Sequence, residues 1–105
     1  MAFVALELSL DVARQLAAPL RVLAREDSDL ARQVRRAVSS VALNLGEGNR
    51  REGADRRRMF RIAAGSAAEA HTALKIAVEW SYLDQTAVST PVHTLDRISS
   101  PSSGP

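Results

Sequence analysis

An arginine cluster in the middle of the chain carries the residue type best suited to binding a phosphate. Its six members lie within twelve positions: Arg50, Arg51, Arg56, Arg57, Arg58 and Arg61. Because Glu52 and Asp55 lie among them, the stretch has a net charge of +4. Guanidinium groups bind phosphate through a planar fork, and neutralising about six phosphates predicts a logarithmic salt slope near −5 on a duplex. A solvated basic face with local ion pairs is the alternative interpretation.

Three further arginines, Arg32, Arg35 and Arg36, precede the cluster and extend the basic segment. Residues 31–61 hold nine arginines against three acidic residues, whereas the segments on either side are net negative. This concentration of positive charge predicts contact with the phosphates of RNA or DNA. Arginine also makes up thirteen of the fourteen basic residues, an excess that the codon usage of a GC-rich genome explains equally well.

The residue patterns of an enzyme or a metalloprotein do not occur in this sequence. It has no cysteine, and its two histidines, His71 and His93, lie outside the spacings that ligate metals. Glu47 and Glu69 have no accompanying nucleophile or base, and no spacing pairs them for acid–base chemistry. We therefore expect no catalytic activity, no cofactor and no bound metal.

Aromatic residues that stack on nucleobases are scarce. The chain has Phe3, Phe60, Trp80 and Tyr82, and Trp80 falls on an apolar stripe of a predicted helix. Proteins that bind single strands use such aromatic platforms. We therefore expect binding to the nucleic-acid backbone with little sequence selectivity.

The opening residues and the apolar runs bear on localisation. Glu7 and Asp11 interrupt the start of the chain, so we expect no secretory signal. The longest uncharged run, residues 85–95, is much shorter than the roughly eighteen residues that cross a bilayer. We therefore expect a cytoplasmic protein that neither spans nor binds a membrane.

Four helices are predicted to position these residues, in one domain over residues 1–98. Apolar residues at helical spacing predict the first helix over about residues 5–23: Leu6, Leu10, Ala13, Ala17 and Leu20. Period-two alternation from Val4 to Val12 leaves a strand as the alternative. Pro19 is expected to kink this helix or to end it early, because proline cannot donate a backbone hydrogen bond.

The second helix follows the capping candidates at residues 27–29, and its apolar stripe consists of Leu30, Val34, Ala37, Val38, Val41 and Leu45. The three arginines of this helix point to the opposite side. Gly46 and Gly48 are expected to break the helix and to begin a turn.

The third helix is expected from residue 54 or 55 to about residue 81. Its two apolar stripes cover about half the circumference and consist of Met59, Ile62, Ser66, Ala70, Ala73, Ala77 and Trp80, and of Phe60, Ala63, Ala67, Leu74 and Val78. Thr90 and Pro91 predict the start of a short fourth helix that ends near Ile98. Residues 99–105 are expected to form a disordered tail. The predicted fold is an all-α, antiparallel up-down four-helix bundle with a short fourth helix.

Polar residues and glycines of the second and third helices are interpreted as structural. Asn44 and Glu47, beside the glycine-rich end of the second helix, and Gln33, on a flank of its apolar stripe, predict a buried or half-buried hydrogen-bond network. Gly65 lies near Glu69 on the polar side of the third helix, where glycine costs about 1 kcal/mol relative to alanine. We expect a contact with another subunit there, with chance tolerance as the alternative.

Two motifs resemble a known family over about residues 5–84. The first comprises residues 33–37, Ser39, Ser40 and residues 44–48, and the second comprises Phe60, residues 64–69 (with Gly65, Ser66 and Glu69) and residues 81–83. Together they resemble the four-helix-bundle proteins encoded in intervening sequences of 23S ribosomal RNA genes. Members of that family usually carry a longer, charged fourth helix.

The resemblance implies an antiparallel bundle, a homopentamer and no enzymatic activity. It also implies kinship with basic accessory proteins of diversity-generating retroelements, which suggests nucleic acid as a partner and a nucleic-acid enzyme as a protein partner. We therefore predict a non-catalytic oligomer that binds the RNA or DNA backbone through the arginine cluster. The alternative is a structural or protein-scaffolding oligomer whose arginines serve solubility and pairing between subunits.

Overall fold

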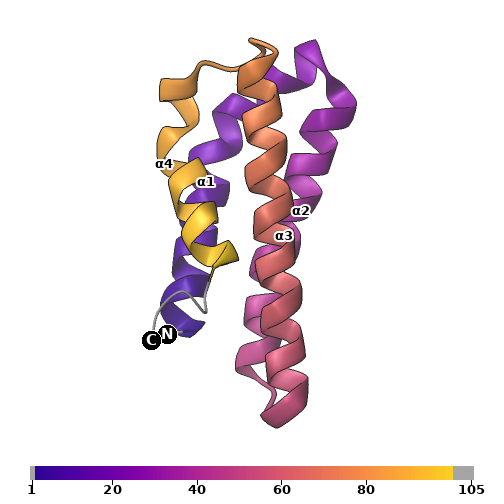
Figure 1. Cartoon of the computed structure of the whole chain (residues 1–105), viewed down its shortest axis with the longest axis vertical. Helices are drawn as coiled ribbons and strands as arrows, with labels where there is room; N and C mark the ends of the chain where they lie inside the picture. The colour runs from indigo at the N-terminus through magenta and orange to yellow at the C-terminus, as the bar shows by residue number, and fades with distance from the viewer. Residues whose placement is uncertain (1, 101–105) are drawn as a thin grey trace.

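Four antiparallel helices make up the computed structural model, which describes residues 2–100 and their side chains from residue 4 onward. They are α1 (Ala2–Glu26), α2 (Ser28–Asn49), α3 (Gly53–Glu79) and α4 (Gln85–Ser99). Each helix packs on the next along the chain, and α4 packs back on α1, so the bundle is closed (Figure 1). The predicted all-α bundle with a short fourth helix is therefore confirmed.

The helix α1 is held by a stripe of four buried residues: Val12, Leu16, Leu20 and Leu23. The strand alternative is wrong, because residues 4–12 are helical throughout. Pro19 does not end the helix, which continues seven residues further to Glu26. Leucines on both sides of Pro19 are buried in the core, and this packing outweighs the one backbone hydrogen bond that proline cannot make.

The start and end of α2 have different causes. At the start, a carboxylate oxygen of Asp27 accepts a hydrogen bond from the backbone N–H of Leu30 at 3.0 Å, as expected of an N-cap. At the end, Gly46 and Gly48 do not break the helix, which continues to Asn49. Gly48 is buried, and its missing side chain leaves room for the ring of Phe60 on α3.

The helix α3 packs mainly through small residues, since Ala63, Ala67, Ala70, Ala73 and Ala77 are buried around Leu74. Short side chains let its neighbours approach closely. The predicted stripes are wider than the buried face, because Ile62 and Trp80 are exposed. Trp80 caps the helix where the chain turns towards α4, and it contacts the ring of Tyr82 edge to face.

The helix α4 begins at Gln85, six residues before Pro91, so the predicted N-terminus at Thr90 and Pro91 is wrong. Val88, Pro91, Leu95 and Ile98 form one buried stripe at helical spacing. Because Pro91 is itself part of this stripe, its packing stabilises the helix across the missing hydrogen bond. Of the predicted tail, Ser99 ends α4 and Ser100 caps it, while residues 101–105 lie outside the described part of the chain.

Within residues 2–100, none of the helices combines the length and the apolar character that crossing a bilayer requires.

Candidate nucleic-acid interface

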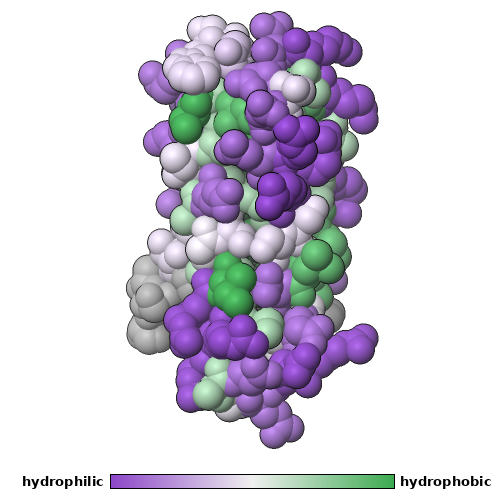
Figure 2. Space-filling model, turned by 90° about the vertical axis from the view of Figure 1, so that its right-hand side faces the viewer, coloured by the Kyte–Doolittle hydropathy of each residue, from purple (hydrophilic) through white to green (hydrophobic). Residues whose placement is uncertain are grey.

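The α2–α3 hairpin carries all six residues of the arginine cluster, with Arg50 and Arg51 in the turn and the other four in the first turns of α3. We call residues 47–61 the hairpin tip, because the α2–α3 hairpin extends beyond the near ends of α1 and α4 (Figure 1). The turn is short because Gly53 adopts a positive φ of 61°, which glycine tolerates without strain. The tip is therefore a compact end of the bundle, where hydrophilic side chains predominate (Figure 2).

One arginine of the tip is held by carboxylates on both sides. Arg51 donates through Nε to Glu47 Oε2 at 2.9 Å and through Nη1 to Asp55 Oδ2 at 3.3 Å. The hydrogen bond and the charge of Glu47, followed by the charge of Asp55, raise the pKa of Arg51 above its ordinary value. Arg58 joins the network by donating to Asp55 Oδ1 at 3.1 Å. These pairs link the end of α2 to the first turn of α3.

A second arginine of the tip lies on an aromatic ring. The guanidinium carbon of Arg56 is 5.0 Å from the centroid of Phe60, within the range of a cation–π interaction. Arg56 also donates to the backbone carbonyl of Arg51 at 3.4 Å. The edge of the same ring lies against Gly48. Arg56 and Phe60 therefore fasten α3 to α2 rather than standing free.

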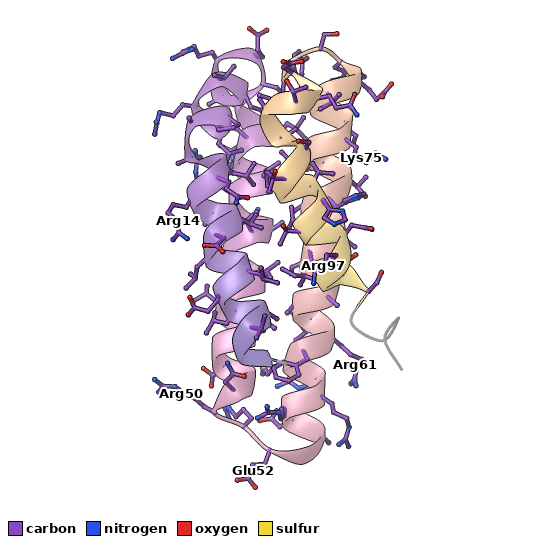
Figure 3. The ribbon with its side chains drawn as sticks, turned by 90° about the vertical axis from the view of Figure 1, so that its left-hand side faces the viewer. Arg14, Arg50, Glu52, Arg61, Lys75 and Arg97 are labelled. Carbon is purple, nitrogen blue, oxygen red and sulfur yellow. The ribbon has the colours of Figure 1, made fainter. Side chains whose placement is uncertain are left out.

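The other three arginines of the tip are Arg50, Arg57 and Arg61. They are exposed, and their side chains make no hydrogen bond or ion pair with any residue between 4 and 100. Figure 3 shows Arg50 and Arg61 on opposite sides of the hairpin, while Glu52 projects from its end. These three guanidinium groups are free to bind an anion from solution.

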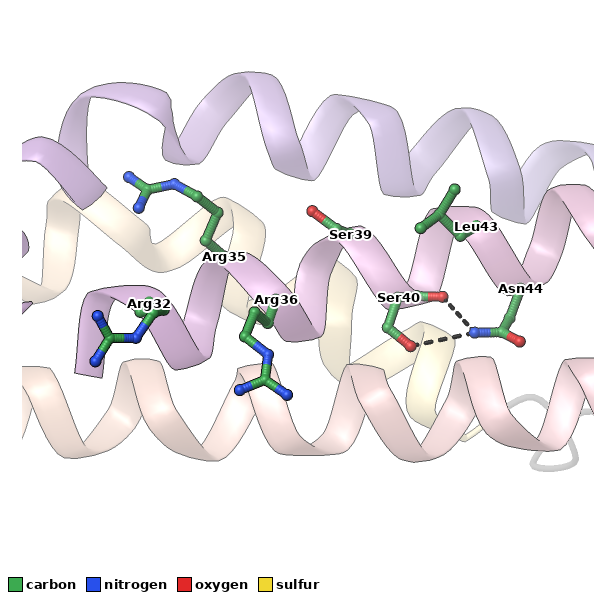
Figure 4. A pocket seen from close by; sticks show the side chains of 7 residues that line it. All are labelled: Arg32, Arg35, Arg36, Ser39, Ser40, Leu43 and Asn44. Atoms are coloured by element: carbon green, nitrogen blue, oxygen red, sulfur yellow. Dashed lines mark hydrogen bonds between the residues drawn. The ribbon is translucent and has the colours of Figure 1, made fainter. Parts of the chain in front are cut away.

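The arginines of α2 form a separate group. Arg32 pairs with Asp29, whereas Arg35 and Arg36 have no ion-pair partner within residues 4–100. Arg35 leans towards α1 and Arg36 towards α3, so the two groups diverge (Figure 4). At 1.5 Å per residue, Arg36 lies about 20 Å along the helix from Arg50. The nine predicted binding arginines are thus not one continuous patch.

A shallow hollow of about 360 Å³ lies on the outer side of α2, beside Arg32, Arg35 and Arg36. Its lining combines the three arginines with Ser39, Ser40, Asn44 and Leu43, whose side chain is 71% exposed. An exposed leucine beside arginines was not expected from the sequence. The sequence nevertheless contains a sign of this exposure, because position 43 lies on the polar side of the predicted helix.

The predicted polar network forms with different members. Ser40 Oγ and Ser66 Oγ share a hydrogen bond of 2.7 Å between α2 and α3. Asn44 donates to the backbone carbonyl of Ser40 at 2.8 Å. Gln33 and Glu47 are exposed and do not take part in this network. Glu47 pairs with Arg51 instead. Ser40 and Ser66 were not among the residues predicted for this network, although Ser40 belongs to the first family motif and Ser66 to the second.

The outer side of α3 is open. A side-chain carbon placed at Gly65 meets nothing within 4 Å, and Glu69, Ile62 and Ile76 are exposed on the same helix. The single chain therefore leaves room for the subunit contact expected at Gly65. Among the described residues, no three histidine, aspartate or glutamate side chains gather closely enough to hold a metal ion.

Comparison with known proteins places the fold and the arginine cluster beside a described family. The model of a family described as 23S rRNA-intervening sequence protein matches residues 4–102. No curated protein and no solved structure matches the chain.

Proposed function

Because the chain belongs to the 23S rRNA-intervening sequence protein family, we propose that it is a non-catalytic, cytoplasmic bundle that binds RNA or DNA through its hairpin tip. The observation that carries this proposal is the presence of three exposed arginines, Arg50, Arg57 and Arg61, which have no side-chain partner among residues 4–100 and lie at a protruding end of the bundle (Figure 1). Arg58 lies beside them; it has a single ion pair, to Asp55, and its side chain is still exposed. Four guanidinium groups are therefore available to phosphates.

The ligand groups of this interface are the phosphates, and base edges play a minor part. Arginine–phosphate contacts fix position without reading sequence. The tip has one aromatic ring, that of Phe60, which is half-buried and already covered by Arg56. We therefore expect similar affinities for nucleic acids that differ only in base sequence. A nucleic-acid enzyme is the protein partner that suits such an accessory role.

Self-association is the second part of the proposal. Apolar side chains are exposed on the outer sides of α2 and α3: Leu43, Ile62, Ile76 and Trp80, the last 61% exposed. Side chains of this kind mark contact surfaces when they gather on one face. We propose the homopentamer that the family resemblance implies. Each subunit then presents its own tip, and several weak contacts combine to strengthen binding to one long polyanion.

A binding titration tests the nucleic-acid proposal. We expect the variant Arg50→Gln/Arg57→Gln/Arg61→Gln to bind a labelled RNA or DNA duplex at least about tenfold more weakly than the native chain at low salt. The matched control is Arg21→Gln/Arg25→Gln/Arg97→Gln, which removes three charges outside the tip. Equal loss in both variants, or absence of binding by the native chain at low salt, contradicts the proposal. The second result together with a multimeric native mass supports the scaffolding alternative.

The native mass tests self-association. We expect light scattering to give a multiple of the 11.3 kDa chain mass, and Gly65→Leu to lower it, because the added side chain fills the open surface of α3. Ala18→Leu, at an exposed position of α1, is the control for size. A multimer whose mass is unchanged in Gly65→Leu places the contact elsewhere, and a monomeric native chain contradicts this part of the proposal.

A further inference from the structure

Negative and positive charges occupy different parts of the hairpin tip. Three carboxylates run across its end: Glu47 and Asp55 on either side of Arg51, and Glu52 at the turn. The unpaired arginines lie on the flanks instead, with Arg50 on the α2 side and Arg61 on the α3 side (Figure 3). Arg57 is four residues before Arg61 and therefore shares its face of α3.

This arrangement suits two phosphate backbones better than one. A single strand that crosses the end of the tip passes over Glu52, the one of these three carboxylates that has no ion-pair partner within residues 4–100, and its charge repels the phosphates. Two backbones separated by a groove place their phosphates against the flanks, with Glu52 over the groove between them. We infer that the tip recognises double-stranded nucleic acid by bridging the two backbones that border one groove.

The size of the tip determines how it meets the duplex. Two packed helices have axes 8–10 Å apart and are together about 20 Å across with their side chains. The major groove of B-DNA is about 12 Å wide. The tip is therefore too wide to enter the groove, and it lies across the groove with one flank on each backbone.

The aromatic residues point to the same class of ligand. Proteins that hold single strands gain about 1–3 kcal/mol per base from aromatic stacking. At the tip, the edge of Phe60 lies against Gly48 and its face is covered by Arg56. The exposed Trp80 lies twenty residues further along α3, about 30 Å away. A single strand at the tip thus lacks stacking, whereas a duplex offers one phosphate charge per roughly 1.7 Å of its axis.

The inference rests on the proposed function, and its experiment separates the two. Fluorescence anisotropy at low salt compares an RNA duplex and a DNA duplex of about two helical turns with unstructured single strands of oligouridine and oligothymidine of the same length. We expect the better of the two duplexes to bind at least about tenfold more tightly than either single strand. Single strands that bind as tightly as the duplexes overturn the inference and leave the proposed function standing. Absence of binding to all four overturns both.

Variants of the two flanks test the bridging geometry. We expect Arg50→Gln to reduce the salt slope of duplex binding by about 1, and Arg57→Gln/Arg61→Gln to reduce it by about 2. We also expect Glu52→Gln to strengthen single-strand binding more than duplex binding, because it removes the carboxylate at the end of the tip. A slope that changes with only one flank, or a Glu52→Gln variant that favours both ligands equally, overturns the bridging geometry.

Discussion

Gly48→Ala is expected to destabilise the bundle by about 2 kcal/mol, although alanine is normally the better helix former. The added carbon overlaps Cε1 of Phe60 and lies 2.7 Å from its Cδ1 and 3.2 Å from Cβ of Met59. Because Phe60 is also held by Arg56, its ring cannot move away without losing that contact. The helices α2 and α3 must therefore separate slightly or Phe60 must leave its position.

The same helix supplies a matched control for this prediction. A carbon added at Gly46 meets nothing within 4 Å, so Gly46→Ala is expected to gain about 0.5–1 kcal/mol from helix propensity alone. The two variants should differ by about 3 kcal/mol in the free energy of unfolding, measured by urea denaturation followed by circular dichroism. If Gly48→Ala is as stable as Gly46→Ala, the close packing of Phe60 on Gly48 is wrong.

The amphipathic pattern was sufficient to predict most of the fold. The apolar stripe of α2 from Leu30 to Leu45 is the stripe that the structure buries, and its N-cap lies within the predicted residues. The helices α1 and α3 were likewise predicted, although α1 extends three residues further at each end. Burial of one face determines these helices, and that face can be read from residue types and spacing alone.

Local breaker signals failed where tertiary packing outweighed them. Gly48 and Pro91 were both interpreted as helix boundaries, yet each lies inside a helix and is buried. Gly48 is required by a ring on another helix, and Pro91 belongs to the apolar stripe of α4. The stripe of α4 begins at Val88 and was available in the sequence. The partner of Gly48 was not, because it depends on how α2 and α3 are aligned.

The candidate site was predicted in its location and not in its internal arrangement. The position of the arginine cluster at a turn followed from the glycines and charges of residues 46–61. Which arginines are free depends on the side-chain geometry around the turn, where Arg51 is paired and Arg56 covers a ring. The exposure of Trp80 was missed for a related reason, because the helix ends one residue before it.

This division of the arginines has a large, measurable consequence for salt dependence. With Arg51 and Arg56 occupied, we expect a single tip to neutralise about four phosphates through Arg50, Arg57, Arg58 and Arg61, which gives a logarithmic slope near −3.6 on a duplex. Raising the salt concentration from about 50 to 200 mM should therefore weaken binding roughly 150-fold. If all six arginines of the cluster took part, the slope would be near −5 and the loss above 1,000-fold.

The measurement uses a duplex too short for a second tip, so that the slope refers to one subunit. We expect Arg50→Gln/Arg57→Gln/Arg61→Gln to reduce the slope to about −1, because only Arg58 remains. Arg51→Gln should leave the slope nearly unchanged, since that guanidinium is already neutralised by Glu47 and Asp55. A native slope near zero contradicts backbone binding altogether. A slope that falls by a full unit in Arg51→Gln shows instead that phosphate displaces the carboxylates, and that the ion pairs of the turn open on binding.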